Sequence, residues 1–192
     1  MKNILVISGH PELSKSTANR VILNELSRHP LISLKDIKEN YPDGLIDVNQ
    51  EQADLHRAEL IVLQFPFIWY GMPSHLKGWM EKVFAMGFAF GKDGDKLKKK
   101  KVMLSITLGG SAQAYSADGQ HQHSIEIFLK PLKQFIHYCG MEYLSPVISY
   151  AMSPGPDNNE EMVKSKAEKH ARKILSEIEK ITLKEFLDQG KQ

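Results

Sequence analysis

Residues 60–84 constrain the fold of this chain more than any other stretch. The run 60–65 is almost wholly apolar, which is typical of a strand buried on both faces of a sheet. Pro66 interrupts it, and Pro73 opens a segment whose apolar residues have helical spacing. The loop between the two prolines carries large aromatic side chains, where polar ones are usual. These side chains either cover a flat apolar ligand at the carboxyl end of a parallel sheet or plug the core, and this stretch alone favours neither.

The rest of the chain repeats the alternation of strand and helix. Further strands are expected at residues 4–8, 32–34 (or 32–37), 102–108 and 143–150. Helices are expected where apolar residues recur with helical spacing, at 21–26, 49–57, 73–84, 125–136 and 162–178. Asn49 is the expected N-cap of the second helix, and the fourth is expected to continue through Pro131.

Strands that alternate with helices predict an α/β fold built on a parallel sheet. Five strands favour a flavodoxin-like three-layer sandwich with strand order 2-1-3-4-5 over the six-stranded dinucleotide-binding fold. No repeat or linker divides the sequence, so one domain is expected over residues 1–180. It is followed by a tail, 181–192, that is either helical or frayed.

Composition excludes several classes of protein. The net charge of +2 argues against a nucleic-acid-binding surface and against a strongly acidic electron carrier. Cys139 is the single cysteine, which excludes internal disulfides and metal sites built from cysteine clusters. The first apolar run, 4–7, is too short for a signal peptide, and no run is long enough to span a bilayer. A cytoplasmic protein without a nucleic-acid partner is therefore expected.

Three loops should meet at one crevice. In a 2-1-3-4-5 sheet the switch point lies between the first and third strands, so the loops at 9–19, 66–70 and 109–110 should converge there. Hydroxyls and free N–H groups where the first loop enters a helix can hold a phosphate, although N-capping by Ser16 or Thr17 also explains them. The loop lacks the Walker and GxGxxG patterns. It also lacks the cysteine that low-molecular-weight phosphatases need.

His10 and the runs 16–19, 64–73, 76–79, 87–90 and 107–110 occur in that order along the chain. Together they resemble the flavodoxin-fold NAD(P)H:quinone oxidoreductases, the DT-diaphorase family. In length the chain is most similar to a bacterial branch that includes the ancillary flavoprotein of glutathione-gated potassium efflux systems. Several motifs in the right order are a stronger indication than any single motif.

The resemblance implies three groups of flavin-binding residues. The flavin phosphate would be held by His10, Ser16, Thr17, Ala18 and Asn19. The isoalloxazine ring would lie along Phe67, Ile68, Trp69 and Tyr70. Its pyrimidine end would be flanked by Thr107, Leu108, Gly109 and Gly110. The long family members that bind FAD extend the chain beyond the last helix, so FMN is favoured here and FAD stays open.

The resemblance also implies catalytic and substrate-binding residues. Tyr115 and His121 would stabilise negative charge on the reduced flavin, with His123 as an alternative to His121. Phe88 and Phe90 would roof the substrate across a homodimer interface, unless they are simply buried packing between two glycines.

The implied activity is a two-electron, ping-pong reduction of quinones or related acceptors by NAD(P)H. The alternative is a regulatory flavoprotein subunit of a potassium efflux transporter, bound peripherally at the inner face of the membrane. A one-electron flavodoxin is disfavoured because such carriers usually have strongly acidic faces.

Overall fold

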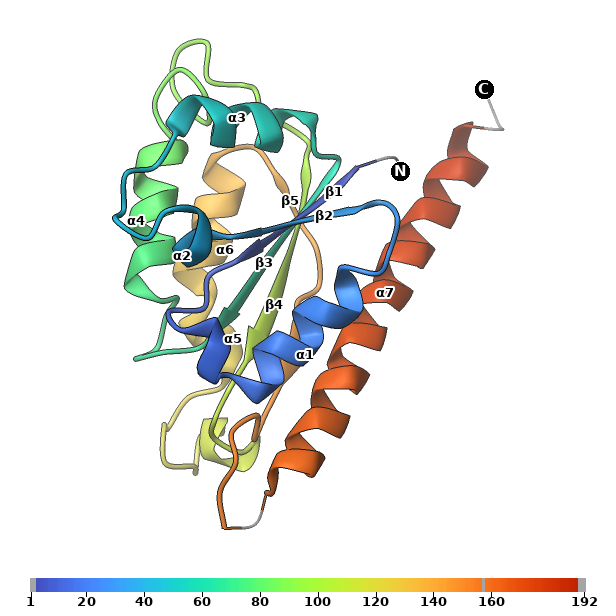
Figure 1. The fold of residues 1–192 in the computed structure, drawn as a ribbon. Coiled ribbons are helices and arrows are strands. Elements are labelled where there is room, and N and C mark those ends of the chain that lie inside the picture. Colours follow the sequence, from blue (N-terminus) through green and yellow to red (C-terminus); the bar gives the residue numbers. More distant parts are fainter. Residues whose placement is uncertain (1–2, 157, 190–192) are drawn as a thin grey trace.

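The computed structural model describes residues 3–156 and 158–189, and its centre is a parallel sheet (Figure 1). The strands are β1 (Ile4–Ser8), β2 (Ile32–Asp36), β3 (Leu60–Pro66), β4 (Lys101–Thr107), β5 (Glu142–Tyr143) and β6 (Val147–Ser149). They pair in the order β2-β1-β3-β4-β5, and β6 also pairs with β4. The flavodoxin-like order predicted from the sequence is therefore confirmed.

The last strand is divided, so the single strand expected over 143–150 is wrong. β5 pairs with Lys101 and Val102 of β4, whereas β6 pairs with its carboxyl end, from Ser105 to Thr107. Pro146 lies between the two pieces. It has no N–H to contribute to the ladder, so the strand is interrupted there.

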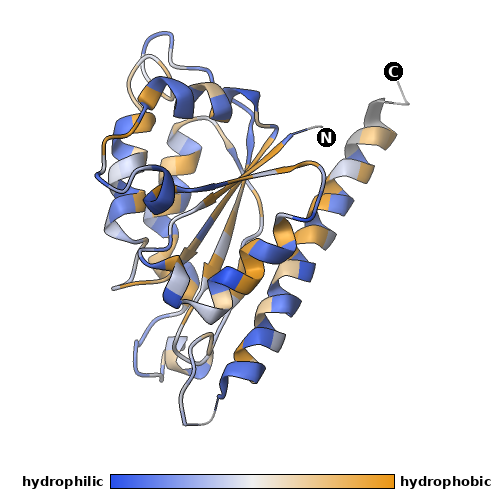
Figure 2. Cartoon of the chain, viewed as in Figure 1, coloured by the Kyte–Doolittle hydropathy of each residue, from blue (hydrophilic) through white to orange (hydrophobic). Residues whose placement is uncertain are grey.

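Helices cover both faces of the sheet, which makes the three layers. On one face lie α1 (Thr17–Leu26) and the long α7 (Glu160–Gln189), which pack against each other. On the other face lie α3 (Val48–Arg57), α4 (Ser74–Val83) and α6 (Lys130–Tyr138). Shorter elements are α2 (Ile37–Asn40), α5 (Ile125–Phe128) and the 3₁₀ turns Leu13–Lys15 and Gln113–Tyr115. In Figure 2 the strands are mostly hydrophobic, whereas hydrophobic and hydrophilic residues alternate along the helices.

Capping decides several boundaries that the sequence placed wrongly. Asp47, not Asn49, caps α3, because its side chain accepts the N–H of Gln50. The expected helix 125–136 breaks at Leu129, and Pro131 falls in the first turn of α6, where its missing N–H is not needed.

The ends of β2 and α7 also differ in detail from the expected bounds. β2 ends at Asp36, whose side chain accepts the N–H groups of Lys38 and Glu39 and so starts α2. α7 continues from residue 181 to Gln189, so this part of the expected tail is helical, and 190–192 lie outside the described residues. The division into a domain and a tail stays a prediction.

The two faces of the sheet differ at the carboxyl ends of the strands. The face under α4 and α6 stays apolar to the end, with Phe65, Ile106 and Leu108 all buried. The face under α1 and α7 becomes polar: its last layer contains Ser8, Gln64, Ser105, Thr107 and Ser149. His170 of α7 lies over this layer, with its Nε2 2.8 Å from Ser105 Oγ and its Nδ1 2.8 Å from Ser149 Oγ.

Acid should destabilise the protein through His170. Burial, with a smaller effect from Lys173, lowers the pKa of His170 from 6.5 to about 4. The unfolded chain binds a proton in this interval that the folded chain does not, so the free energy of unfolding should fall by up to about 3 kcal/mol as the pH drops from about 6.5 to about 4. Urea unfolding at several pH values measures this loss, and His170→Gln should reduce it.

His137→Gln, which changes an exposed imidazole, is the matched control and should keep the wild-type pH dependence. Burial also lowers the pKa of the half-buried His10 and His75. The loss should therefore become smaller in His170→Gln without vanishing, and an unchanged loss would contradict the prediction.

Candidate functional site

Backbone hydrogen bonds fix the loops at the carboxyl edge of the sheet, which is the lower end of the view in Figure 1. The first residue after each of β1, β3 and β4 donates its N–H to a carbonyl near the carboxyl end of a neighbouring strand. Gly9 donates to Gln64 at 2.8 Å, Phe67 to Thr107 at 2.8 Å and Leu108 to Ser149 at 2.9 Å. The loops after β1, β3, β4 and β6 therefore lie next to one another, as the strand order predicts.

The loop after β1 leads into a helix N-terminus with free hydrogen-bond donors, which we call the anion-binding helix start because donors of this kind suit an anion. Ser16 caps α1, and its Oγ accepts both the backbone N–H of Asn19 at 3.1 Å and the side-chain Nδ2 at 2.9 Å. With both acceptor positions filled, the hydroxyl proton of Ser16 remains available to donate. In the described part of the chain no acceptor bonds the N–H groups of Thr17 and Ala18, so these also point to a ligand or to solvent.

His10 belongs to the same loop after β1 and carries a further donor. Its Nδ1 accepts the N–H of Glu12 at 3.0 Å, and burial lowers the pKa of the imidazole. The ring is therefore neutral at pH 7, and the bond to Glu12 assigns its proton to Nε2. Thr17 uses its hydroxyl differently, since Oγ1 donates to Glu160 at 2.9 Å.

The side chain of Asn19 does not reach the surface at the anion-binding helix start. Its side chain is 4% exposed, and its Oδ1 accepts Gln64 Nε2 at 2.5 Å and Thr107 Oγ1 at 3.1 Å. The side-chain amide of Asn19 thus connects the start of α1 to the carboxyl ends of β3 and β4. The buried Ala18 likewise offers only its backbone N–H.

The loop after β3 holds its aromatic side chains in a strained turn. Ile68 and Gly71 exchange two backbone hydrogen bonds of 3.0 Å, and the two residues between them, Trp69 and Tyr70, have φ values of 45° and 64°. Both central residues of such a turn need positive φ, which normally selects glycine or asparagine. Trp69 is 91% exposed. The core-plug interpretation therefore fails for Trp69.

Core packing does explain two other aromatic residues of the same stretch. Phe65 and Trp79 are 1% and 0% exposed. Trp79 also donates its Nε1–H to the buried carboxylate of Glu51 at 3.1 Å. The stretch thus sends one tryptophan into the interior and the other out to solvent.

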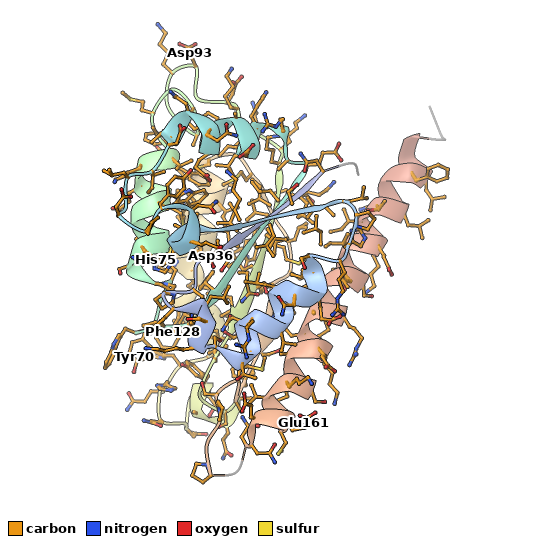
Figure 3. The ribbon with its side chains drawn as sticks, in the orientation of Figure 1. Asp36, Tyr70, His75, Asp93, Phe128 and Glu161 are labelled. Carbon is orange, nitrogen blue, oxygen red and sulfur yellow. The ribbon has the colours of Figure 1, made fainter. Side chains whose placement is uncertain are left out.

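Side chains from three loops and α5 form an aromatic cluster at this edge of the sheet. The cluster consists of Phe67, Tyr70, Tyr115, His121, Phe128 and Tyr150. The rings of Tyr115 and His121 are 4.2 Å apart. Those of Tyr70 and Phe128, which are labelled close together in Figure 3, are 5.0 Å apart. An apolar pocket of about 330 Å³ opens against Phe67, Tyr70 and Phe128.

Gly110 lies directly under this cluster. A Cβ added to Gly110 would be 3.2 Å from Tyr115, which is a tight contact, and 3.6 Å from His121 Nε2, which is an ordinary one, so a larger residue would displace the Tyr115 ring by a few tenths of an ångström. His121 is further fixed by Tyr70, whose hydroxyl is 3.3 Å from its Nδ1. His123 is exposed, and within the described part of the chain its one ring contact is with Phe128, at 5.9 Å between the ring centres. The geometry thus favours His121 over His123 as the histidine of the site.

Two tyrosines of the cluster, Tyr115 and Tyr150, are hydrogen-bond donors at neutral pH. Burial, together with the nearby Tyr70, raises the pKa of Tyr115. Burial, with a contribution from Glu126, raises the pKa of Tyr150. Both phenols therefore keep their protons.

Phe88 and Phe90 are not brought to this site in the same chain. α4 runs back from the carboxyl edge, so the loop that follows it lies at the opposite end of the sheet, where Figure 3 labels Asp93. Both side chains are half-buried, and Phe90 packs 5.6 Å from the ring of Tyr138. They could approach a site of this kind only from a second copy of the chain.

The sequence did not single out Phe128, Tyr150 or Ser153 as site residues. A Cβ on Gly109 would lie 3.3 Å from Ser153 Oγ, so the loop after β6 closes over the Gly-Gly pair. The signal that could have found Tyr150 and Ser153 is their position after the last strand, because all carboxyl ends of a parallel sheet face the same edge.

Comparisons with known proteins agree with this geometry. The model of a family described as "Flavodoxin-like fold" matches residues 2–174. An uncharacterized NAD(P)H oxidoreductase of Bacillus subtilis (strain 168), YrkL, is 37% identical over 146 residues, which are 76% of this chain and 84% of that protein. The glutathione-regulated potassium-efflux system ancillary protein KefF of Enterobacter sp. (strain 638) is 35% identical over 172 residues, 90% of this chain and 95% of that protein.

A solved structure is also similar. The general stress protein 14 of Treponema denticola, in complex with FMN, has a TM-score of 0.84 and 30% sequence identity. The match covers 92% of this chain and 98% of that one.

Replacing Trp69 should not destabilise the ligand-free protein. Asparagine tolerates positive φ, so Trp69→Asn should raise the free energy of unfolding by about 0.5–1 kcal/mol. Urea unfolding measures the change. The control is Trp79→Phe, which removes the indole N–H that bonds Oε2 of the buried Glu51 and should cost about 1–3 kcal/mol. Destabilisation by Trp69→Asn as large as that of the control would contradict the exposed, strained turn.

Proposed function

The chain belongs to the flavodoxin-like fold family, and from this premise we propose that it is an FMN-dependent NAD(P)H oxidoreductase that reduces quinones or related acceptors by two electrons. The observation that carries the proposal is Trp69, 91% exposed in a left-handed turn that lies beside an anion-binding helix start. Such strain is retained where it serves a ligand. The oxidoreductase relative YrkL and the FMN complex of general stress protein 14 support this function.

The phosphate of FMN fits the donors at the start of α1. The hydroxyl of Ser16, the N–H groups of Thr17 and Ala18, and Nε2–H of His10 would hold it. Asn19 would act from behind, by holding Ser16. None of these groups needs a charged side chain, because the helix N-terminus itself favours an anion.

The isoalloxazine would be held by the loops after β3 and β4. The N–H groups of Phe67, Ile68 and Leu108 are already bonded within the protein and cannot serve it. Those of Trp69, Tyr70, Gly109 and Gly110 have no acceptor in the described part of the chain. These four N–H groups and the faces of the Trp69 and Tyr70 rings are therefore the contacts that we assign to the flavin ring.

A bound flavin supplies the redox chemistry by accepting a hydride from NAD(P)H and passing it to the quinone, with the two substrates occupying the site in turn. The protein supplies the binding of both substrates and the handling of protons. Tyr115 keeps its phenol proton and can donate it in a hydrogen bond to developing negative charge. His121 is fixed by Tyr70 through Nδ1, so its Nε2, on the Gly110 side, is the atom that holds or releases a proton.

A homodimer completes this proposal. The loop with Phe88 and Phe90 lies far from the site of its own chain, and the apolar side chains of Met86 and Tyr138 near it are 75% and 66% exposed. Exposed apolar surface of this kind is suited to a partner subunit. We place Phe88 and Phe90 over the substrate of that partner.

A regulatory role at a potassium efflux transporter is the second candidate function. The observation that favours it is the likeness to KefF over 95% of that protein. Among the described residues no helix is long and apolar enough to cross a membrane. A protein in this role would therefore bind the transporter from the cytoplasm. It would use the same flavin site, so the two candidates differ in the purpose of the bound flavin.

Purified protein should be yellow and contain FMN. NADH or NADPH should bleach it in the absence of oxygen, and menadione should restore the colour. Absorbance at the flavin band follows both steps, and chromatography of the heat-released flavin distinguishes FMN from FAD. Colourless protein that shows no flavin fluorescence change on titration with FMN would overturn the proposed function.

Replacing His121 should slow turnover without releasing the flavin. His121→Ala removes the positioned proton donor, so kcat should fall about 100-fold while the flavin content stays at the wild-type value. His123→Ala is the matched control and should keep most of the activity. A larger loss of kcat in His123→Ala than in His121→Ala would show that the wrong histidine is assigned.

A further inference from the structure

A series of hydrogen-bonded polar side chains runs along the α1/α7 face of the sheet and ends at the anion-binding helix start. We call it the buried polar chain, and its members are His170, Ser105, Gln64, Asn19 and Ser16. The links measure 2.8 Å from His170 Nε2 to Ser105 Oγ, 2.5 Å from Ser105 Oγ to Gln64 Oε1, and 2.5 Å from Gln64 Nε2 to Asn19 Oδ1. The last link, from Asn19 Nδ2 to Ser16 Oγ, measures 2.9 Å. The first four members are between 0% and 4% exposed.

The hydrogen bonds of the buried polar chain all run in one direction. Ser105 gives its only proton to Gln64 Oε1, so it must accept the proton of His170 Nε2. Nδ1 of His170 then accepts from the hydroxyl of Ser149. Burial keeps the imidazole neutral, since its pKa is lowered to about 4. A neutral imidazole has one donor and one acceptor, which fixes this tautomer.

The amides continue the same direction. With Oε1 turned toward Ser105, Gln64 presents its NH₂ group to Asn19 Oδ1, which also accepts the hydroxyl of Thr107 at 3.1 Å. Asn19 therefore presents its own NH₂ group to Ser16. If the hydrogen bonds of the buried polar chain ran the other way, Ser16 would have to donate its proton to Asn19 and would have none left for an anion.

Packing alone does not require polar side chains at this level of the sheet. On the opposite face, the residues at the ends of the same strands are apolar, as Phe65 and Ile106 show. Burial of polar groups costs free energy unless each one is bonded, and an apolar layer would avoid that cost. The polar layer is confined to the face that carries α1 and its anion-binding N-terminus.

We propose that His170 is a positioning residue: through the buried polar chain it fixes the hydroxyl of Ser16 as a hydrogen-bond donor to the phosphate of the flavin. The inference rests on the proposed function, because it assigns the anion at Ser16 to FMN. His170 lies on α7, at the opposite end of the buried polar chain from Ser16, and we assign it no contact with flavin or substrate. Its effect is therefore specific to the phosphate end of the ligand.

Riboflavin provides the test, because it has the same ring as FMN and lacks the phosphate. The dissociation constants of both ligands are measured by fluorescence titration of the full-length protein after removal of its flavin. The ratio of the riboflavin value to the FMN value reports the contribution of the phosphate. His170→Phe and Ser105→Ala should each lower this ratio about tenfold, which corresponds to about 1.4 kcal/mol, and should leave the riboflavin value unchanged.

Two further variants separate positioning from general stability. His170→Gln can keep a side-chain N–H donor toward Ser105 and should restore most of the ratio. Ile174→Val shortens another buried side chain of α7 that is not a member of the buried polar chain, and it should leave the ratio at the wild-type value.

Each outcome decides between the possibilities. If the wild type binds neither ligand, the proposed function fails. If it binds FMN more tightly than riboflavin but His170→Phe and Ser105→Ala keep the full ratio, or weaken both ligands equally, the positioning role is wrong and the proposed function stands. If His170→Phe does not fold, Ser105→Ala decides the question by itself.

Discussion

Gln64 forms the interaction on which the arrangement of the site depends. Its backbone carbonyl accepts the N–H of Gly9, and its side chain bonds Asn19 on one side and Ser105 on the other. One buried residue at the end of β3 thus sets the relative position of the loop after β1, the start of α1 and the end of β4. Because the interior offers no water to replace a lost partner, these bonds can form in only one arrangement at low cost.

The strained turn of Trp69 and Tyr70 is possible because its base is firmly held. Phe65 is packed in the core just before it, and Phe67 is bonded to Thr107. On the other side, α4 is anchored through Trp79, whose indole donates to Glu51. Glu51 is 0% exposed and also bonds Lys35 and Tyr41, so its charge is compensated inside the protein. A rigid strand and a rigid helix therefore impose the conformation of the turn.

Much of the fold could be predicted from local pattern. The apolar runs located β1, β3 and β4 within about a residue, since strands buried on both faces have few other readings. The errors have physical causes that a periodic pattern does not contain. Asp47 rather than Asn49 caps α3 because of side-chain geometry, and Pro146 divides the last strand because it has no N–H to donate. The edge at which the loops meet was predicted correctly, while the aromatic cluster there was predicted incompletely: Phe128 and Tyr150 join it only through the packing of distant segments.

The sequence by itself determined the order of the strands, the edge at which the loops meet and the residue types that those loops carry. These follow from hydrophobic period, turn residues and the rules of parallel sheets, all of which act over short stretches of chain. Only the tertiary structure decided that Asn19 turns inward while Ser16 faces outward, that His121 rather than His123 stands over Gly110, and that Phe88 and Phe90 lie at the far end. Each of these depends on contacts between residues distant in sequence, because burial and hydrogen-bond partners are set by the whole fold and not by neighbours along the chain.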